Sequence, residues 1–494
     1  MTSAAPDAQQ GARAPARVVL WFRNDLRLHD NALLERAAAL GDAAVVLPVF
    51  VADPSQQACR LLADTPRCGP HRARALAAAV ADLRARLRRA GSGLAVLEGA
   101  PAEALARLRP DVVLTHAEFA HEERAAEAAV AAALRAQGGA LQLLPADTLW
   151  AADALPFAPD LHDLPTSGVT FLKRVRAAAA PAPPLGDGLA QAAQLRLGAV
   201  WAAHPALDAP LPGPTPSTDA LGGESAGLAL LQTYLWGTDA VRSYAATRNE
   251  LRGGSGLSPF LALGCLSARH VAAKLARYDE RHPGATDAIG FEPGGLLFEL
   301  GVRDFFRFAA LRWGAALFAA QGAVPRQPPQ VWSDDAAALH AWRVGATGVP
   351  LIDAIMRQLL RDGHISNRAR QITASWAVLA RGLDWRCCAE HFESLLADYD
   401  PSANAGNWQA VCGLSGGREN WFSVAKQSSQ FDADGSFVRE FVPELARLPT
   451  EQLHAPWTLT ADALAACGVV LGVTYPAADL AALRAPPARP AAKR

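Results

Sequence analysis

The sequence predicts two domains of different class: a doubly wound, Rossmann-like parallel α/β domain, followed by a larger all-α domain. Up to about residue 150, short apolar runs alternate with amphipathic helical stretches. Such alternation is typical of a parallel sheet covered by helices on both faces. After Gly222, strand-like runs almost vanish and helical spacing dominates to about residue 450. A chain of 494 residues is also too long for one ordinary core.

The α/β domain is expected over 17–150, after a leader, 1–16, whose Ala, Pro and Gln content predicts disorder. Apolar runs predict strands at 18–22, 44–51, 94–97, 111–115 and 141–144, and amphipathic stretches predict helices near 71–90, 101–109 and 122–137. No GxGxxG follows the first strand, so no motif indicates a dinucleotide on this domain. The arginines of helix 71–90 are interpreted as one solvated face rather than a binding patch; they are Arg72, Arg74, Arg84, Arg86, Arg88 and Arg89.

Proline-rich pieces and little periodicity mark residues 151–224 as the connector between the domains. The all-α domain is expected over 225–450. Residues 451–494 thin into an Ala, Pro and Arg tail whose end is predicted to be disordered.

Charge and cysteine content narrow the function classes. Lys and Arg total 47 against 48 Asp and Glu, so any nucleic-acid site must be a local patch rather than a property of the whole-protein field. The seven cysteines show no CxxC pair and no His at metal spacing, which favours free thiols, no metal site and a cytoplasmic location. Organelle import through the leader is the alternative. No run reaches the length of a membrane span, and a monomer is expected by default.

Site chemistry is concentrated in residues 398–408, where two carboxylates, two amides and an indole fall within eleven residues. Upstream, Asn367, Arg370 and Gln371 open an apolar helical run, and Trp385 follows. A guanidinium, carboxylates and amides can address both edges of a planar heterocycle, with tryptophans behind it. The constellation suggests a flavin.

These segments resemble the photolyase/cryptochrome family. The match runs from Val18 to about Pro449 and is most similar to the DASH cryptochrome branch. Any one segment is weak evidence, but their order over some 430 residues is very specific. The segments that carry the resemblance are 21–31, 163–166, 171–174, 222–224, 247–249, 257–267, 298–300, 303–308, 345–350, 366–368, 406–408 and 442–445.

The resemblance implies FAD as the cofactor and an antenna role for the α/β domain. It assigns phosphate contacts to Tyr244, Ser255, Leu257 and Ser258, and flavin-ring and ribityl contacts to Arg303, Asn367, Arg370, Asp398, Asp400 and Asn404. The Gly/Ser loop 253–258 offers backbone N–H groups to a phosphate, although such a loop alone is more often a plain turn, and it is shorter than the DASH pattern.

The residue types in this set predict the charge of one carboxylate and the protonation of the reduced flavin. Arg370 with Asp398 is a plausible buried pair that keeps the carboxylate ionised. Asn404 falls where the family places a residue against flavin N5. Because an amide cannot deliver a proton as a carboxylic acid can, we expect the reduced flavin to be held as the anion.

Three tryptophans, Trp408, Trp385 and Trp332, match the family's electron relay from the flavin to the surface. A single Trp is usually core packing, but three at matching positions favour the relay. A folate antenna, 5,10-methenyltetrahydrofolate, is held in the family by an acidic residue that falls on Glu122 or Glu123. A plain helix start, with both carboxylates against its dipole, explains these two residues equally well.

The residues that match the family's binding site for a pyrimidine dimer depart from the family pattern. Glu299 and Gln371 are retained, but Val302 and Ala410 stand where the family has aromatic rings that hold a flipped pyrimidine dimer. Stacking is worth about 1–3 kcal/mol per base, so losing both rings costs roughly 10²-fold in lesion affinity. Scattered basic residues could contact phosphates, although ordinary surface charge explains them as well: Arg242, Arg248, Arg343, Arg361, Arg368 and Lys426.

The sequence therefore predicts a blue-light-absorbing FAD flavoprotein of the DASH cryptochrome type, photoreduced through the Trp relay, a photoreceptor with weak binding of single-stranded or damaged DNA. The first alternative is a photolyase, a carbon–carbon lyase that repairs cyclobutane pyrimidine dimers, preferentially in single strands. The second is a light-gated binding protein without a substrate.

Overall fold

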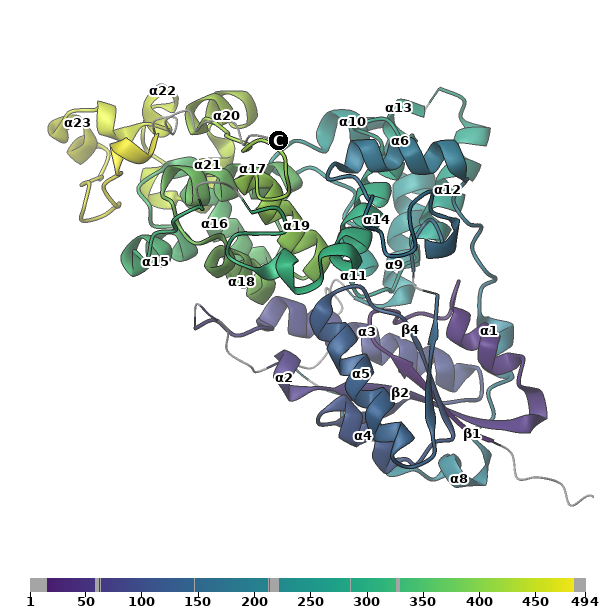
Figure 1. The fold of residues 1–494 in the computed structure, drawn as a ribbon. Helices are drawn as coiled ribbons and strands as arrows, with labels where there is room; N and C mark the ends of the chain where they lie inside the picture. The colour runs from purple at the N-terminus through teal and green to yellow at the C-terminus, as the bar shows by residue number, and fades with distance from the viewer. Residues whose placement is uncertain are drawn as a thin grey trace, which may run out of the picture.

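The computed structural model describes residues 16–57, 62, 64–145, 147–211, 213, 222–284, 286–325 and 329–483 (Figure 1). The predicted leader, up to residue 15, and the end of the predicted tail, 484–494, lie outside the described residues. In the described ranges, no helix combines the length and the apolarity that a membrane span requires.

The N-terminal domain is a five-stranded parallel sheet in the order β3-β2-β1-β4-β5. Its strands are β1 (Ala16–Phe22), β2 (Ala44–Ala52), β3 (Ala95–Glu98), β4 (Val112–His116) and β5 (Ala140–Leu144). Val18 pairs with Val46 on one side and Val112 on the other. The predicted doubly wound sheet is confirmed, and its strand order reverses between β1 and β4.

Both faces of the sheet are covered, because alternate residues of the buried strands point to opposite sides. Val18, Leu20 and Phe22 pack with helices α1 (Ala32–Ala38) and α3 (Pro70–Arg89). Val19 and Trp21 pack with α4 (Pro101–Arg107) and α5 (His121–Arg135). Helix α1 was not expected from the sequence, since it follows β1 after a short loop and is only seven residues long.

The segment between the domains contains α6 (Gly168–Ala178), α7 (Leu189–Ala193) and α8 (Gly198–Ala202). Helix α6 lies against α14 (Leu296–Trp313) of the second domain, while α8 lies against β2. The connector is therefore packed on both domains.

The expectation that the arginines of α3 form a solvated face is wrong for two of them, Arg84 and Arg86. Arg84 is buried and donates to Ala209 O at 2.8 Å, whereas Arg88 stays exposed in its pair with Asp208 at 2.6 Å. Arg86 Nε lies 2.8 Å from Glu224 Oε2. Helical periodicity shows which residues share a face of α3. It does not show that the connector and the second domain cover that face.

The second domain is all-α, as predicted. Among the residues described after 222, no strand occurs, only isolated bridges. Its helices are α9 (Glu224–Gln232), α10 (Tyr244–Thr247), α11 (Ser258–Ala262), α12 (Ala268–Arg281), α13 (Thr286–Ile289), α14, α15 (Ala336–Val344), α16 (Pro350–Asp362), α17 (Asn367–Ser375), α18 (Trp385–Leu395), α19 (Pro401–Cys412), α20 (Val424–Phe431), α21 (Ser436–Phe441), α22 (Thr450–Leu453) and α23 (Ala461–Ala466).

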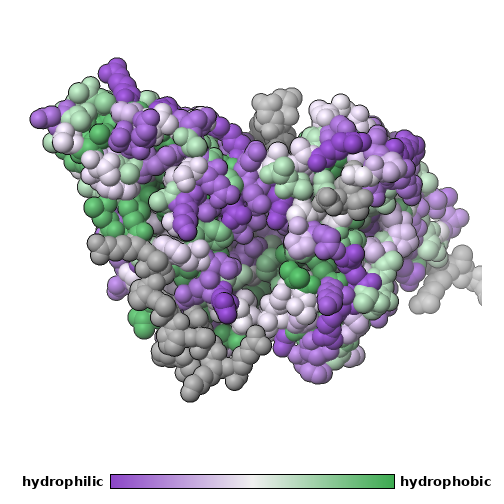
Figure 2. Space-filling view, turned by 90° about the horizontal axis from the view of Figure 1, so that it is seen from above, coloured by the Kyte–Doolittle hydropathy of each residue, from purple (hydrophilic) through white to green (hydrophobic). Residues whose placement is uncertain are grey.

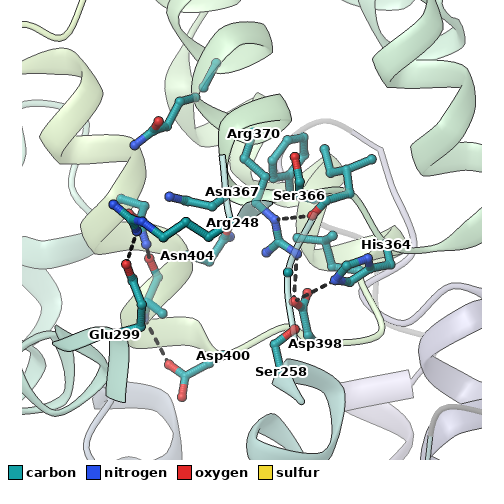
Figure 3. A pocket seen from close by; sticks show the side chains of 18 of the residues that line it. Arg248, Ser258, Glu299, His364, Ser366, Asn367, Arg370, Asp398, Asp400 and Asn404 are labelled. Atoms are coloured by element: carbon teal, nitrogen blue, oxygen red, sulfur yellow. Dashed lines mark hydrogen bonds and ion pairs between the residues drawn. The ribbon is translucent and has the colours of Figure 1, made fainter. Parts of the chain in front are cut away.

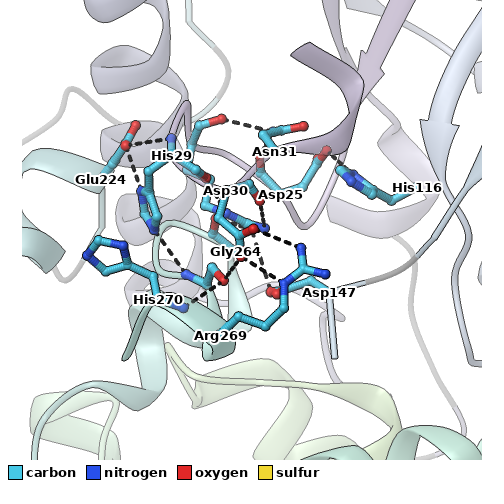
Figure 4. A network of polar contacts seen from close by, with 12 residues as sticks. Asp25, His29, Asp30, Asn31, His116, Asp147, Glu224, Gly264, Arg269 and His270 are labelled. Carbon is cyan, nitrogen blue, oxygen red and sulfur yellow. Dashed lines mark hydrogen bonds and ion pairs between the residues drawn. The ribbon is translucent and has the colours of Figure 1, made fainter. Parts of the chain in front are cut away.

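A buried polar latch joins the domains; we use this name for His29, Asp30, Glu224, Ser267 and Arg269 (Figure 4). Glu224 has no exposed surface and accepts hydrogen bonds from the backbone of Leu28 and His29, at 2.7 and 3.1 Å, and from the His29 ring. Arg269 holds Asp30 with two hydrogen bonds of 2.9 and 3.0 Å. None of the five has a buried side-chain polar atom without a partner.

Candidate functional site

The helical domain encloses a cavity of about 370 Å³, which lies within the usual range for small-molecule sites (Figure 3). Side chains from α10, α14, α17 and α19 line it, together with the loop that precedes α11. Seen from above, the helical domain is hollowed between two lobes, with apolar residues in the depth (Figure 2).

Helix caps fix the two helices that supply most of the lining. Ser366 caps α17 by accepting from Ala369 N at 3.2 Å, and Asn367, Arg370 and Gln371 then share the face that lines the cavity. Asp400 caps α19 by accepting from Ala403 N at 2.9 Å. The face of α19 presents Asn404, Asn407, Trp408 and Val411 to the cavity.

Arg370 and Asp398 form the predicted ion pair, with 2.7 Å between Nη2 and Oδ2. Arg370 is also held by Ile365 O at 3.1 Å. Burial alone would raise the pKa of Asp398, but the Arg370 guanidinium, assisted by His364 and the Ser258 hydroxyl, outweighs burial and lowers it. The carboxylate is therefore ionised inside the cavity.

Several polar atoms of the cavity wall have no protein partner. Asp398 Oδ1 and Gln371 Oε1 are buried without a hydrogen bond. Asn404 donates Nδ2 to Ala389 O at 3.1 Å, which leaves its Oδ1 available. Unmet buried acceptors cost about 1–3 kcal/mol each, so they favour a ligand that brings N–H donors. A flavin ring, which carries N–H donors beside carbonyl acceptors, fits this wall.

The loop assigned to the phosphates lines the same cavity, with Gly253, Gly254, Ser255, Gly256 and Ser258. Gly254 and Gly256 have φ of +129° and +70°, a backbone region that favours glycine. Tyr244 and both serines lie in the lining. Leu257 does not; it is buried behind the loop, and its N–H points to Ser255 Oγ at 3.4 Å.

Besides Leu257, two assigned residues, Arg303 and Val302, are not part of the cavity lining. Arg303 faces the α/β domain, where it donates to Asp147 O at 3.0 Å. One turn further along α14, Arg307 reaches Asp400, with 3.3 Å between Nη2 and Oδ2. Val302 packs beside Gly168 of α6, where a methyl group on that glycine would lie 3.5 Å from Val302 Cγ2. The replaced ring at position 302 therefore leaves no gap in the lining.

Ala410 does line the cavity, and so does Glu299, which forms an ion pair with Arg248. Burial raises the pKa of Glu299, and Arg248 opposes that rise. Arg368 lies between the rings of Phe422 and Phe431, at 5.2 and 5.4 Å. Its pKa is lowered by burial and by the neighbouring Arg248. Arg248 and Glu299 therefore lie in the cavity lining, while Arg368 lies outside the lining, near Arg248.

His364, Phe392, Asn420 and Phe422 are among the lining residues that sequence reasoning did not identify. Phe392 follows the apolar period of α18 and looks like core. Asn420 and Phe422 come from the aperiodic segment after α19, where no pattern predicts a direction. Trp421, between them, is half-buried and is not part of the lining.

The three assigned tryptophans have different surroundings. Trp408 lines the cavity and is 3% exposed. Trp385 is buried and Trp332 is half-buried, and both indole N–H groups donate to one oxygen, Ala320 O, at 3.2 and 3.1 Å. The ring centroid of Trp408 lies 6.2 Å from that of Trp342, a residue that the sequence did not single out.

A second cavity, of about 310 Å³, lies between the domains and includes Glu122, Glu123, His121 and Trp385. Tyr399 and Asn404 line both cavities. The hollow at the carboxyl ends of β1 and β4 is far smaller, about 20 Å³. Arg23 occupies that place, bonded to Glu127 at 2.6 Å. Space for a ligand is thus offered by the interdomain cleft rather than by the sheet's own switch point.

The two candidate carboxylates of the cleft, Glu122 and Glu123, have different surroundings. Glu122 is half-exposed and paired with Arg67 at 2.5 Å between Nη2 and Oε2. Glu123 Oε2 is buried without a partner, and so is Nδ1 of His121. Burial raises the pKa of Glu123 to about 7, with a further rise from the nearby Glu118.

Comparison of the sequence and the fold with known proteins identifies the family. Residues 296–485 match the model described as the FAD binding domain of DNA photolyase, and residues 18–186 match the DNA photolyase model. The cryptochrome DASH of Natronomonas pharaonis is 37% identical over 93% of this chain and 96% of that protein. The cryptochrome DASH of Synechocystis is 36% identical over 94% of each chain.

Solved structures agree. The crystal structure of the Synechocystis sp. PCC6803 cryptochrome superposes with a TM-score of 0.84 at 33% identity, over 95% of this chain and 98% of that chain. A class III photolyase from Agrobacterium tumefaciens gives 0.77 at 27% identity, over 97% and 98%. FAD is the cofactor of the helical domain. The chain belongs to the photolyase/cryptochrome family, in its DASH cryptochrome branch.

Proposed function

We propose that this protein is a blue-light photoreceptor in which Trp408, Trp385 and Trp332 supply electrons to bound FAD. FAD, when excited by blue light, is a strong one-electron oxidant. The residues of the chain hold it and pass electrons inward: Arg370, Asp398 and Gln371 would bind the ring, and the loop 253–256 would bind the phosphates.

The observation that carries this proposal is the arrangement of the three indoles. Trp408 lies in the cavity wall, while Trp332 reaches the surface region. Trp385 and Trp332 are tied together through Ala320 O, so their separation is fixed by two hydrogen bonds. Such a series lets an electron move in short steps from the surface to the cavity.

The test is photoreduction of the purified FAD-loaded protein under blue light with a thiol reductant, followed by absorbance. We expect the FAD of the wild type to be photoreduced. Trp408→Phe should lose most of the photoreduction rate. Trp332→Phe should slow it. Trp313→Phe is a matched control, because Trp313 lies at the end of α14 outside the cavity lining. A wild-type rate in Trp408→Phe would overturn the relay.

Repair of cyclobutane pyrimidine dimers is the second candidate function. Glu299, Gln371 and Arg248 in the cavity support it, since arginines bind phosphates. Ala410 weakens the grip because it offers no ring for stacking. The test is repair of one dimer in a single-stranded oligonucleotide by the reduced protein under blue light, against a dark control. Repair would make the protein a photolyase, and its absence with intact photoreduction would leave a photoreceptor.

We further propose that the interdomain cleft binds a folate antenna through Glu123 rather than Glu122. The unpartnered Oε2 of Glu123 and Nδ1 of His121 support this, because a pterin ring carries both donors and acceptors. Glu123→Ala should lose binding of methenyltetrahydrofolate, followed by its fluorescence. Glu122→Ala is the matched control and should retain binding. The opposite result would transfer the role to Glu122.

We also infer a cytoplasmic location, which the absence of CxxC pairs among the seven cysteines supports. Fractionation of the source cells, with detection by antibody, tests it. Recovery in an organelle would overturn it.

A further inference from the structure

The indole in ring contact with Trp408 is Trp342, not Trp385. The two centroids are 6.2 Å apart at an interplanar angle of 78°, an edge-to-face contact. Phe392 touches both, stacked on Trp342 with centroids 6.0 Å apart and packed edge-on against Trp408 at 5.1 Å. Among the ring contacts of the described residues, none joins Trp408 to Trp385.

Trp342 is sealed from solvent. It has no exposed surface, and its N–H donates to Thr373 Oγ1 at 2.8 Å. A hydroxyl is too weak a base to remove the indole proton. By contrast, Trp332 is half-buried and can exchange with solvent.

We propose that Trp342 is a fourth electron donor, a closed side branch of the relay at Trp408. The proposal rests on the relay itself. Trp408 would give one electron to excited FAD and so become oxidised. Trp342 then gives one electron to the oxidised Trp408, so Trp408 is restored and Trp342 carries the positive charge. No covalent bond forms or breaks, and the proton of Trp342 stays on its nitrogen, bonded to Thr373.

The ring of Trp342 is closed to solvent, and His391 meets it edge-on, with centroids 5.6 Å apart, but the N–H of Trp342 is held by Thr373. The charge on Trp342 therefore has no exit through its proton and returns through Trp408. The branch therefore stores oxidation reversibly close to the cavity. The arm through Trp385 and Trp332 reaches the surface and leads to lasting reduction. Trp342 competes with that arm, so its removal should raise rather than lower the yield of net photoreduction.

The test follows oxidised tryptophan by laser-flash absorption in the FAD-loaded Trp385→Phe variant, in which the surface arm is cut. We expect a signal that decays completely, with no lasting reduction. In Trp385→Phe/Trp342→Phe the long-lived part of the signal should be lost. Trp376→Phe is the matched control, because Trp376 is also buried in this domain but makes no ring contact with Trp408. Equal lifetimes with and without Trp342 would overturn the proposal.

Loss of the buried Trp342 ring is a cavity-forming change, so a milder variant is needed. Thr373→Val keeps the shape and removes only the acceptor of the Trp342 N–H. Combined with Trp385→Phe, it should shorten the signal while Trp342 is intact, and an unchanged lifetime counts against the branch. Trp408→Phe distinguishes failure of the relay from failure of the branch. If this variant still forms oxidised tryptophan at the wild-type level, the relay is refuted. If it forms none, and Trp342→Phe has no effect on the lifetime, only the branch is refuted.

Discussion

The interdomain latch and the FAD cavity are both buried and rich in charge, yet they differ in how their polar atoms are satisfied. In the latch, Glu224 and Asp30 use both carboxylate oxygens, on His29, Ser267 and the arginines. In the cavity, Asp398 uses one oxygen and leaves the other without a partner, as Gln371 does. A closed network holds domains together, whereas an open one is completed by a ligand.

The largest effect is expected from breaking the latch. Glu224→Ala leaves the buried His29 and the half-buried Arg86 without their carboxylate, which lowers the unfolding free energy by about 3–5 kcal/mol. Urea unfolding measures it. Glu103→Ala, an exposed glutamate on α4, should change stability by no more than about 0.5 kcal/mol. Similar values for the two variants would show that the latch does not stabilise the fold.

Breaking the cavity pair should act on the ligand instead of the fold. Asp398→Ala removes the anion that Arg370 holds, and we expect about 2 kcal/mol weaker FAD binding, roughly thirtyfold in Kd. The unfolding free energy of the FAD-free protein should change far less than in Glu224→Ala, because one oxygen of Asp398 is unmet there. Asp362→Ala, at the surface end of α16, is the control for FAD affinity. Undiminished FAD retention in Asp398→Ala would contradict an open site.

A pH effect is expected at the cleft. The pKa of Glu123 rises from 4.5 to about 7 in the folded protein, so its protonated form stabilises the fold. That stability is fully present below pH 4.5 and is lost as the pH rises through about 7, on the order of 3 kcal/mol in all. Glu123→Gln should remove this dependence, measured as Tm against pH, whereas Glu122→Gln should keep it. The same slope in Glu123→Gln as in the wild type would assign the titration elsewhere.

The smallest effect concerns the two replaced rings. Ala410→Tyr adds a stacking wall to the cavity and should strengthen binding of a dimer-containing single strand by about 1–2 kcal/mol. Val302→Trp should add nothing to affinity and should destabilise the fold by about 1–3 kcal/mol, since α6 packs there. Fluorescence titration and urea unfolding distinguish them. A gain in affinity from Val302→Trp would show that position 302 faces the ligand after all.

The same contrast explains what could be predicted from the sequence. The face of α17 that carries Asn367, Arg370 and Gln371 follows from a helical period and a cap, both local properties, and the strands follow from apolar runs. Arg303 and Arg307 are one turn apart on α14, so both satisfy any pattern that points inward. Asp147, more than 150 residues away in sequence, binds both and leaves only Arg307 able to reach Asp400.

Long-range packing also decided the other errors. The arginines of α3 have a regular spacing, but the carbonyl of Ala209 and the carboxylate of Glu224, which hold Arg84 and Arg86, come from segments whose path no local pattern indicates. Val302 lies against α6, whose close approach Gly168 and Gly301 allow, and it is not part of the cavity lining. A residue type that matches a family position does not show what its side chain contacts, because a neighbouring helix can pack against that position.

The carbonyl of Ala320 has a consequence for the redox behaviour of the two indoles that it joins. An oxygen with two lone pairs can accept both N–H groups, but an indole that has lost an electron becomes a much stronger donor. It then draws the shared oxygen toward itself and weakens the bond to the other ring. In the proposed relay, Trp332 and Trp385 would thus be anticooperative: oxidation of one would lower the other's readiness to be oxidised, and this part of the protein would hold one positive charge at a time.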